Sequence, residues 1–322
     1  MQDLYLGIDT SNYKTSIAVI DSSNDTVFAK SEYLEVPEGK RGLRQSEAFF
    51  RHSNRLPEYI EEMCSCVRAS SIKAVGVSSR PRRVEGSYMP CFISGVNAAR
   101  EISQVLGIPL HQFSHQEGHA AAVLEDGGED MYDGSDALLF HLSGGTTEFL
   151  RCRMDEAGYD LAIVGGTKDI SLGQLIDRTG VAMGLPFPSG SYMDDTVCSY
   201  TGKPSHIMSK IRIDDGYFNL SGAETQILRE LEKRDAEDYP SVIKEIFDAS
   251  WDLLMRSTSL LSDRYAISKV FMAGGVASSQ YIRRRVLQAS SSSPEIRFGK
   301  PELSGDNAVG IARLARRISN NK

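Results

Sequence analysis

The segment "LYLGIDTSNYKTSIAVID" at residues 4–21 decides the fold. It contains an apolar strand, a polar turn and a second strand with alternating β-branched residues, which is typical of a β-hairpin. Residues 138–155, "LLFHLSGGTTEFLRCRMD", repeat this order of strand, turn and returning strand. The two segments match in architecture rather than residue by residue, which predicts an internally duplicated fold.

Strands and helices alternate after the first hairpin. Apolar residues recur at helical intervals in 46–70 and again in 97–107, with a buried parallel strand, "IKAVGVSS", between them. This alternation predicts an α/β layer. The acidic, glycine-rich run "EDGGEDMYDGSD" marks a boundary. We therefore expect a first lobe at residues 1–134, a second lobe at 135–303, and a C-terminal helix at 304–322 that returns to the first lobe.

Length, charge and cysteine content narrow the functional class. A chain of 322 residues fits two domains of about 150 residues each. The net charge of −7 gives no overall attraction to nucleic acid, so such binding needs a local basic patch. Five cysteines without C-x-x-C pairing indicate reduced thiols. With no signal peptide and no run of about 18 apolar residues, we expect a cytoplasmic protein that does not enter a membrane.

Three turns that follow apolar strands have the composition of phosphate sites, where backbone N–H groups must converge without bulky side chains. The first is "SGGTT", with Ser143, Gly144, Gly145 and Thr146, although a plain glycine-rich hairpin turn is an equal alternative. The second carries Asp9, whose carboxylate could hold a hydrated metal such as magnesium. The third, "AGGVASS", contains Gly274, Gly275 and Ser279. Together they predict a nucleotide in a cleft between lobes.

The histidines of "LHQFSHQEGHAAA" form a candidate metal site. His111 is expected on a strand, whereas His115 and His119 are four apart at the start of a helix and can reach one ion. Asp306 is either the third ligand or a plain helix N-cap. A zincin-type peptidase is disfavoured because its motif has a glutamate directly after the first histidine. Here Gln116 follows His115, and Glu117 comes one position later. His52 and His206 are expected on the surface.

Six segments match one family in order and spacing over nearly the whole chain. They are "LGIDTSNYKTSIAVID", "HQEGHA", "LLFHLSGGTTEFL", "IDRTGVAMGLPFPSGS", "FMAGGVASS" and "GDNAVGIA". The chain resembles the tRNA threonylcarbamoyladenosine synthase family (TsaD), formerly described as endopeptidases (Gcp). This resemblance implies two RNase H-like lobes, as in actin, sugar kinases and heat-shock ATPases, with a nucleotide between them. It also implies one divalent ion, iron or zinc, on His115, His119 and Asp306. The family's nucleotide contacts map to Ser143, Gly144, Gly145, the ribose-binding Asp177, and Gly190.

The chain departs from the family at positions that face substrates. Asn12, Tyr13 and Lys14 replace an acidic pair of the first turn, Thr146 replaces a histidine, and Ser279 replaces an asparagine. A glycine–proline segment is replaced by a stretch that adds Arg80, Arg82 and Arg83. These arginines could grip tRNA phosphates or an anionic substrate, or could form a solvated surface. The pattern predicts a divergent paralogue.

The resemblance implies a metal-dependent threonylcarbamoyl transferase that uses ATP or an acyl-adenylate, with an acceptor that has changed or is tRNA adenosine. Asp9 and Glu117 are the expected catalytic carboxylates, Glu117 by orienting a ligand histidine. Two alternatives remain: a non-catalytic partner subunit that binds nucleotide and a related active protein, and a metalloendopeptidase. A TsaB-like protein is a further expected partner.

Overall fold

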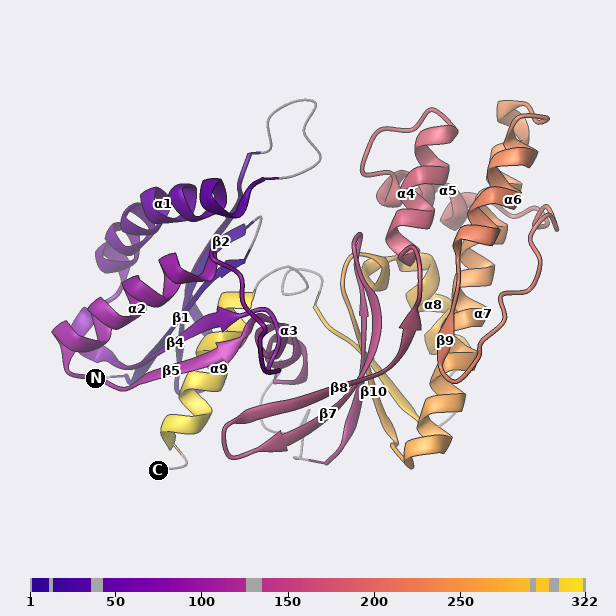
Figure 1. Ribbon diagram of the computed structural model, residues 1–322. Coiled ribbons are helices and arrows are strands. Elements are labelled where there is room, and N and C mark those ends of the chain that lie inside the picture. Colours follow the sequence, from indigo (N-terminus) through magenta and orange to yellow (C-terminus); the bar gives the residue numbers. More distant parts are fainter. Residues whose placement is uncertain are drawn as a thin grey trace. The chain divides into compact units, whose positions relative to one another are not determined.

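The computed structural model describes residues 2–11, 14–35, 43–125, 135–289, 294–300 and 307–320. The chain forms two compact units, each built on its own β-sheet (Figure 1). The first unit comprises Met1–Ser135, Arg153–Leu161 and Glu302–Lys322, and the second comprises Asp136–Cys152 and Ala162–Pro301. The hairpin tip Arg153–Leu161 thus belongs to the first unit, although its strands continue in the sheet of the second.

The sheet of the first unit has the strand order β3-β2-β1-β4-β5. Its strands are β1 (Leu4–Ser11), β2 (Lys14–Asp21), β3 (Thr26–Tyr33), β4 (Ile72–Arg80) and β5 (Leu110–Ser114). The first three pair antiparallel, whereas β4 and β5 run parallel to β1. Parallel pairing requires crossover connections, which are the helices α1 (Gln45–Cys66) and α2 (Phe92–Leu106).

Helices cover both faces of this sheet (Figure 1). Side chains alternate along a strand, so Leu6 and Ile8 face one side, where they pack with residues of α1 and α2. Tyr5 faces the other side and packs against α9 (Asn307–Asn320). Gly7 is required there, because a Cβ at this position would lie 2.1 Å from the carbonyl oxygen of Ala308.

The short helix α3 (His115–Leu124) begins directly after β5 and packs against α9. Ser114 caps its N-terminus in a capping box with Glu117. The two helices meet at glycines, since a Cβ on Gly310 would lie 1.9 Å from the carbonyl oxygen of Gly118. This close approach fixes the backbone of α3 against the helix that begins at Asn307.

The sheet of the second unit repeats the topology of the first. Its strands are β6 (Ala137–Leu142), β7 (Thr147–Asp155), β8 (Gly158–Thr167), β9 (Tyr217–Phe218), β10 (Lys269–Ala273) and β11 (Glu295–Phe298). The order β8-β7-β6-β10-β11 corresponds to β3-β2-β1-β4-β5, and β9 is added beside β8. As in the first unit, β6 pairs antiparallel with β7, whereas β10 is parallel to β6 and β11. The predicted duplicated α/β fold is confirmed.

Within the described residues, the second unit is completed by the helices α4 (Leu172–Ala182), α5 (Gly190–Ser199), α6 (Ser221–Leu231), α7 (Tyr239–Tyr265) and α8 (Gln280–Ala289). Their apolar faces share one core with the sheet. Within it, the rings of Phe140 and Phe149 stack with centroids 3.9 Å apart. No helix among the described residues combines the length and the apolar character that crossing a bilayer demands.

Candidate functional site

The turn between β6 and β7 is a tight, self-bonded loop. The amide of Ser143 donates to the carbonyl of Thr146 at 2.8 Å, and the amide of Thr146 donates to Ser143 Oγ at 3.0 Å. Ser171, the N-cap of α4, donates from Oγ to the carbonyl oxygen of Gly144 at 2.7 Å. The predicted phosphate turn is therefore held against the N-terminus of a helix, a place that favours anions.

A cavity of about 450 Å³ lies within the second unit beside this turn. It is lined by five of the predicted nucleotide-binding residues, which come from well-separated parts of the chain: Gly144, Asp177, Gly190, Gly275 and Ser279. Phe247, Ile176 and Val276 add apolar wall. A size of several hundred Å³, apolar walls and a few polar groups are typical of small-molecule sites. The other four predicted residues, Ser143, Gly145, Thr146 and Gly274, are in the same turns but do not line the cavity.

Hydrogen bonds fix the polar groups of this cavity. Asp177 accepts a bond from the amide of Ser189 at 2.8 Å, directly before Gly190. Ser279 donates from its hydroxyl to Asp194 Oδ1 at 2.5 Å, and the amide of Gln280 donates to the other oxygen at 2.8 Å. Asp194 also lines the cavity but was not predicted, because the sequence did not indicate α5.

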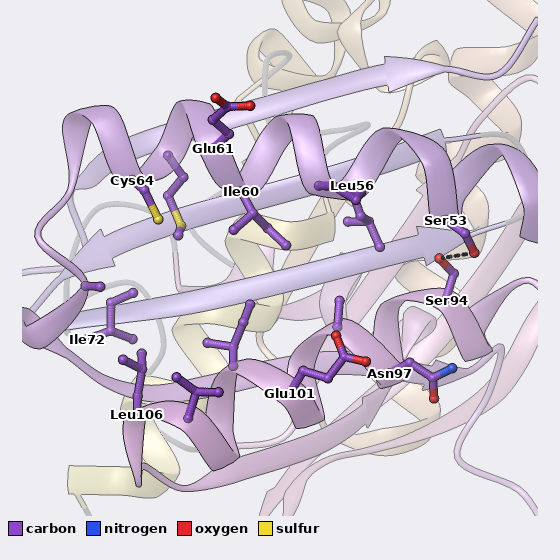
Figure 2. A pocket seen from close by; sticks show the side chains of 16 residues that line it. Ser53, Leu56, Ile60, Glu61, Cys64, Ile72, Ser94, Asn97, Glu101 and Leu106 are labelled. Carbon is purple, nitrogen blue, oxygen red and sulfur yellow. Dashed lines mark hydrogen bonds between the residues drawn. The ribbon is translucent and has the colours of Figure 1, made fainter.

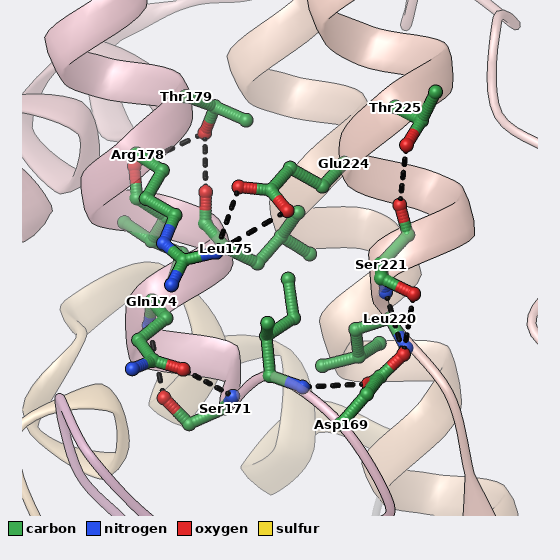
Figure 3. Close-up of polar contacts among 12 residues, drawn as sticks. Asp169, Ser171, Gln174, Leu175, Arg178, Thr179, Leu220, Ser221, Glu224 and Thr225 are labelled. Carbon is green, nitrogen blue, oxygen red and sulfur yellow. Dashed lines mark hydrogen bonds and ion pairs between the residues drawn. The ribbon is translucent and has the colours of Figure 1, made fainter.

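A second network joins the start of α4 to the start of α6 (Figure 3). Asp169 accepts from the amides of Leu220 and Ser221 at 2.8 and 3.0 Å. Burial raises the pKa of Asp169, but these hydrogen bonds outweigh burial and lower the pKa to about 2. Arg178 pairs with Glu224 at 3.3 Å between the same two helices. These contacts frame the helix that carries Asp177.

The two expected metal-binding histidines lie side by side in the first unit. The rings of His115 and His119 have centroids 4.7 Å apart and meet edge to face. His115 Nδ1 lies 2.8 Å from Asp9 Oδ2. Asp9 is 1% exposed, and its other oxygen has no hydrogen-bond partner among the described residues. The third expected ligand, Asp306, lies outside the described residues, and within those residues no three ligand side chains are arranged to hold a metal.

Glu117 acts as a helix cap. Its Oε2 accepts from the amide and the hydroxyl of Ser114, each at 2.7 Å, and Arg83 Nη1 lies 3.9 Å from Oε1. Burial raises the pKa of Glu117, and the bonds from Ser114 partly oppose this. The expected contact with a ligand histidine is not among the hydrogen bonds that Glu117 makes within the described residues. Within the described residues Glu117 therefore stabilises the start of α3, and its expected catalytic role stays a prediction.

One expectation differs from the structure, and another stays a prediction. Arg83 pairs with Asp155 at 2.9 Å in the hairpin tip and is partly exposed, so its expected contact with phosphate stays a prediction. His52 was expected on the surface but is 0% exposed, and its Nδ1 lies 2.7 Å from Thr15 Oγ1. Burial lowers the pKa of His52 to about 4, so its ring is neutral at pH 7. His206 is exposed, as expected.

A further cavity of about 690 Å³ lies in the first unit between α1 and α2 (Figure 2). Its lining is mainly apolar, with Leu56 and Ile60 from α1 and Leu106 from α2. The hydroxyls of Ser53 and Ser94 close one end with a hydrogen bond of 3.1 Å. This cavity between α1 and α2 contains none of the predicted site residues. The expected tRNA contact and the expected TsaB-like partner stay predictions.

Solved structures show what the duplicated sheets resemble. Component A of (R)-2-hydroxyglutaryl-CoA dehydratase from Acidaminococcus fermentans aligns over 99% of both chains with a TM-score of 0.55 and 15% identity. A ROK family glucokinase from Streptomyces griseus aligns over 98% of this chain and 99% of that chain, with a TM-score of 0.51 and 13% identity. Full-length HypF covers 98% of this chain with 55% of its own, at a TM-score of 0.56 and 13% identity. These likenesses confirm the actin-like and sugar-kinase-like fold.

Sequence relatives are more informative about the family. The tRNA N6-adenosine threonylcarbamoyltransferase of Bacillus licheniformis is 29% identical, with 97% of this chain and 91% of the relative aligned. That of Thermotoga neapolitana is 27% identical over 96% of this chain and 92% of the relative. The family model for tRNA N6-adenosine threonylcarbamoyltransferase (TsaD) matches residues 30–313. The chain therefore belongs to the TsaD family of tRNA N6-adenosine threonylcarbamoyltransferases.

Proposed function

We propose that this chain transfers a threonylcarbamoyl-type acyl group from an acyl-adenylate to an amine, and that it uses an iron or zinc ion. The observation that carries the proposal is the convergence of three separate segments, at Gly144, at Gly190 and at Gly275, on one cavity of the second unit. Such convergence of glycine turns, apolar wall and fixed carboxylates suits a nucleotide, whose base, ribose and phosphate need different surroundings.

The cavity offers a distinct surface to each part of an adenylate. Phe247 and Val276 provide apolar area for a base, and Asp177 is held in place to accept bonds from ribose hydroxyls. Gly144, in the β6–β7 turn beside the N-terminus of α4, leaves room for a phosphate. Asp177, Asp194 and Asp195 bring negative charge to the lining, so we expect a polyphosphate nucleotide such as ATP to enter with magnesium.

The first unit supplies donors that fit the proposed ion. Two adjacent imidazoles are ligands that iron and zinc accept, and Asp306 remains the expected third ligand outside the described residues. When bound, the ion would polarise an acyl oxygen as a Lewis acid. His115 and His119 would hold the ion at the N-terminal turn of α3, where the capping box keeps the helix start in one conformation.

The peptidase alternative is weakened by the bonds of Glu117. A peptidase glutamate must reach the water that it activates, whereas this carboxylate is buried and bonded to Ser114. The acceptor is proposed to be an adenosine amine in tRNA, as the relatives' names state for those proteins, with a small-molecule amine as the second possibility because Asn12, Tyr13 and Lys14 alter the first turn.

Product analysis tests the proposal. The protein is incubated with ATP, bicarbonate, threonine and an adenylate-forming enzyme, with tRNA in one arm and a mixture of small amines in another, and products are identified by mass spectrometry. Wild type and Gly222→Ala should give a threonylcarbamoylated product, and His115→Ala should not. A chain that gives no product in any arm, while a tRNA-modifying relative does under the same conditions, would contradict the proposal and favour the partner-subunit alternative. Casein cleavage that His115→Ala abolishes would favour the peptidase.

A further inference from the structure

Asp9 lies on the face of β1 that α9 covers, next to the start of α3. Along β1, Tyr5, Gly7 and Asp9 share one face by strand alternation, and Tyr5 and Gly7 both contact α9. Asp9 is paired with Ser16 of β2 near the end of the hairpin. Its buried carboxylate lies against His115, the first residue of α3.

The surroundings of His115 define the roles of its two nitrogens. Asp9 Oδ2 lies 2.8 Å from Nδ1, and the ring of Phe92 lies tilted with its centroid 6.0 Å away. A carboxylate oxygen accepts, so the geometry assigns the proton of this hydrogen bond to Nδ1. His119 meets the ring of His115 edge to face.

Close backbone packing positions this contact. A Cβ on Gly310 would collide with Gly118, so α3 lies directly against α9, and Gly7 lets α9 lie directly against β1. These three backbones set where Asp9 and His115 lie.

We propose that Asp9 is the positioning residue of the metal site: it accepts the Nδ1 proton of His115 and presents Nε2 to the ion. A metal-bound histidine commonly donates its other ring N–H to a carboxylate, which orients the ring and makes the ligand more basic. This inference rests on the proposed function only for the presence of an ion. It assigns to Asp9 the orienting role that the sequence had suggested for Glu117, and it names the coordinating nitrogen.

The test is zinc affinity, measured by competition with a chromophoric chelator on the full chain. Asp9→Ala should weaken Zn²⁺ binding by about 10- to 100-fold, the usual cost of losing such a partner. Asp9→Asn keeps an accepting oxygen and should restore part of the loss. The matched control is Glu125→Ala, which removes another buried carboxylate of the first unit, one bonded to Tyr159 and Arg317 rather than to His115. Its Zn²⁺ affinity should equal that of wild type.

A second measurement does not depend on any variant of Asp9 folding. Nitrogen-15 NMR of histidine-labelled wild type without metal reports the tautomer of each imidazole, and His115→Gln assigns the signal. The proposal requires a proton on Nδ1 of His115. A proton on Nε2 instead, or wild-type affinity in Asp9→Ala, would overturn the inference while leaving the proposed transfer standing. A wild type that binds no Zn²⁺ would overturn both.

Discussion

Two hairpins occupy equivalent places in the two sheets: β1–β2 in the first unit and β6–β7 in the second. Their polar groups nevertheless have different roles. In the first, Asp9 is buried at 1% exposure and its carboxylate contacts His115. In the second, the turn bonds to itself through Ser143 and Thr146, and Gly144 opens onto a cavity. One copy carries a positioned side chain, and the other carries exposed backbone.

The difference shows how a duplicated scaffold can divide its chemistry. A buried carboxylate needs a fixed partner, and in the first copy that partner is His115 of α3. Glycines remove side chains, so the second copy leaves room that a ligand can fill. We therefore expect ligand binding in the two units to respond to different substitutions.

The largest expected effect comes from separating α3 from α9 in the first unit. Gly310→Ala would place a Cβ 1.9 Å from the carbonyl oxygen of Gly118, so the helices must move apart. Overpacking of this kind should cost about 3 kcal/mol in the free energy of unfolding. Urea unfolding measures this cost. Gly222→Ala, with no atom within 4 Å of the new Cβ, is the control, and equal stability of the two variants would contradict the packing argument.

A smaller effect is expected at the cavity of the second unit. Gly190 is the first residue of α5, and a Cβ there would meet no atom within 4 Å. The variant Gly190→Ala should therefore keep or slightly gain stability. The new methyl group occupies the cavity and should weaken nucleotide binding by roughly 1–3 kcal/mol, or about 5- to 150-fold. Calorimetric titration with ADP and magnesium measures the affinity, and Gly222→Ala is again the matched helix-start control. Unchanged affinity would place the nucleotide elsewhere.

The smallest effect concerns Asp169, whose hydrogen bonds link the start of α4 to the start of α6. The pKa of Asp169 is about 2 in the folded chain and about 3.9 in an unfolded one, so its ionised form stabilises the fold above pH 4. This contribution is lost as the pH falls from about 4 to 2. Because the side chain is exposed, the advantage of wild type over Asp169→Asn should be about 1 kcal/mol or less. Urea unfolding at pH 7 and pH 3 should show the advantage shrink at the lower pH; a constant or growing gap would refute it.

Local patterns predicted the parts of the site that depend on local geometry. A separation of four on one helix was enough to bring His115 and His119 together, since helix geometry is fixed over one turn. Glycine turns after apolar strands were identified from their composition, since small residues leave backbone N–H groups uncovered. The duplication itself was visible in the two hairpin sequences.

Contacts between distant residues were not predictable in the same way. Asp9 and His115 are 106 positions apart, and only the packing of α3 on the sheet brings them together. β8 was missed because exposed Ala162 and Ile163 break its alternation, and α5 was missed because it lacks a clear apolar stripe. His52 could have been placed correctly, since it shares helical spacing with buried Leu56, Tyr59 and Met63.

The most direct test of the account titrates two ligands, Zn²⁺ and ADP with magnesium, against wild type, His115→Ala and Gly190→Ala. We predict that wild type binds both, that His115→Ala loses Zn²⁺ but keeps its ADP affinity, and that Gly190→Ala weakens ADP but keeps its Zn²⁺ affinity. Loss of both ligands in either folded variant, or a wild type that binds neither, would contradict the division of chemistry between the two units.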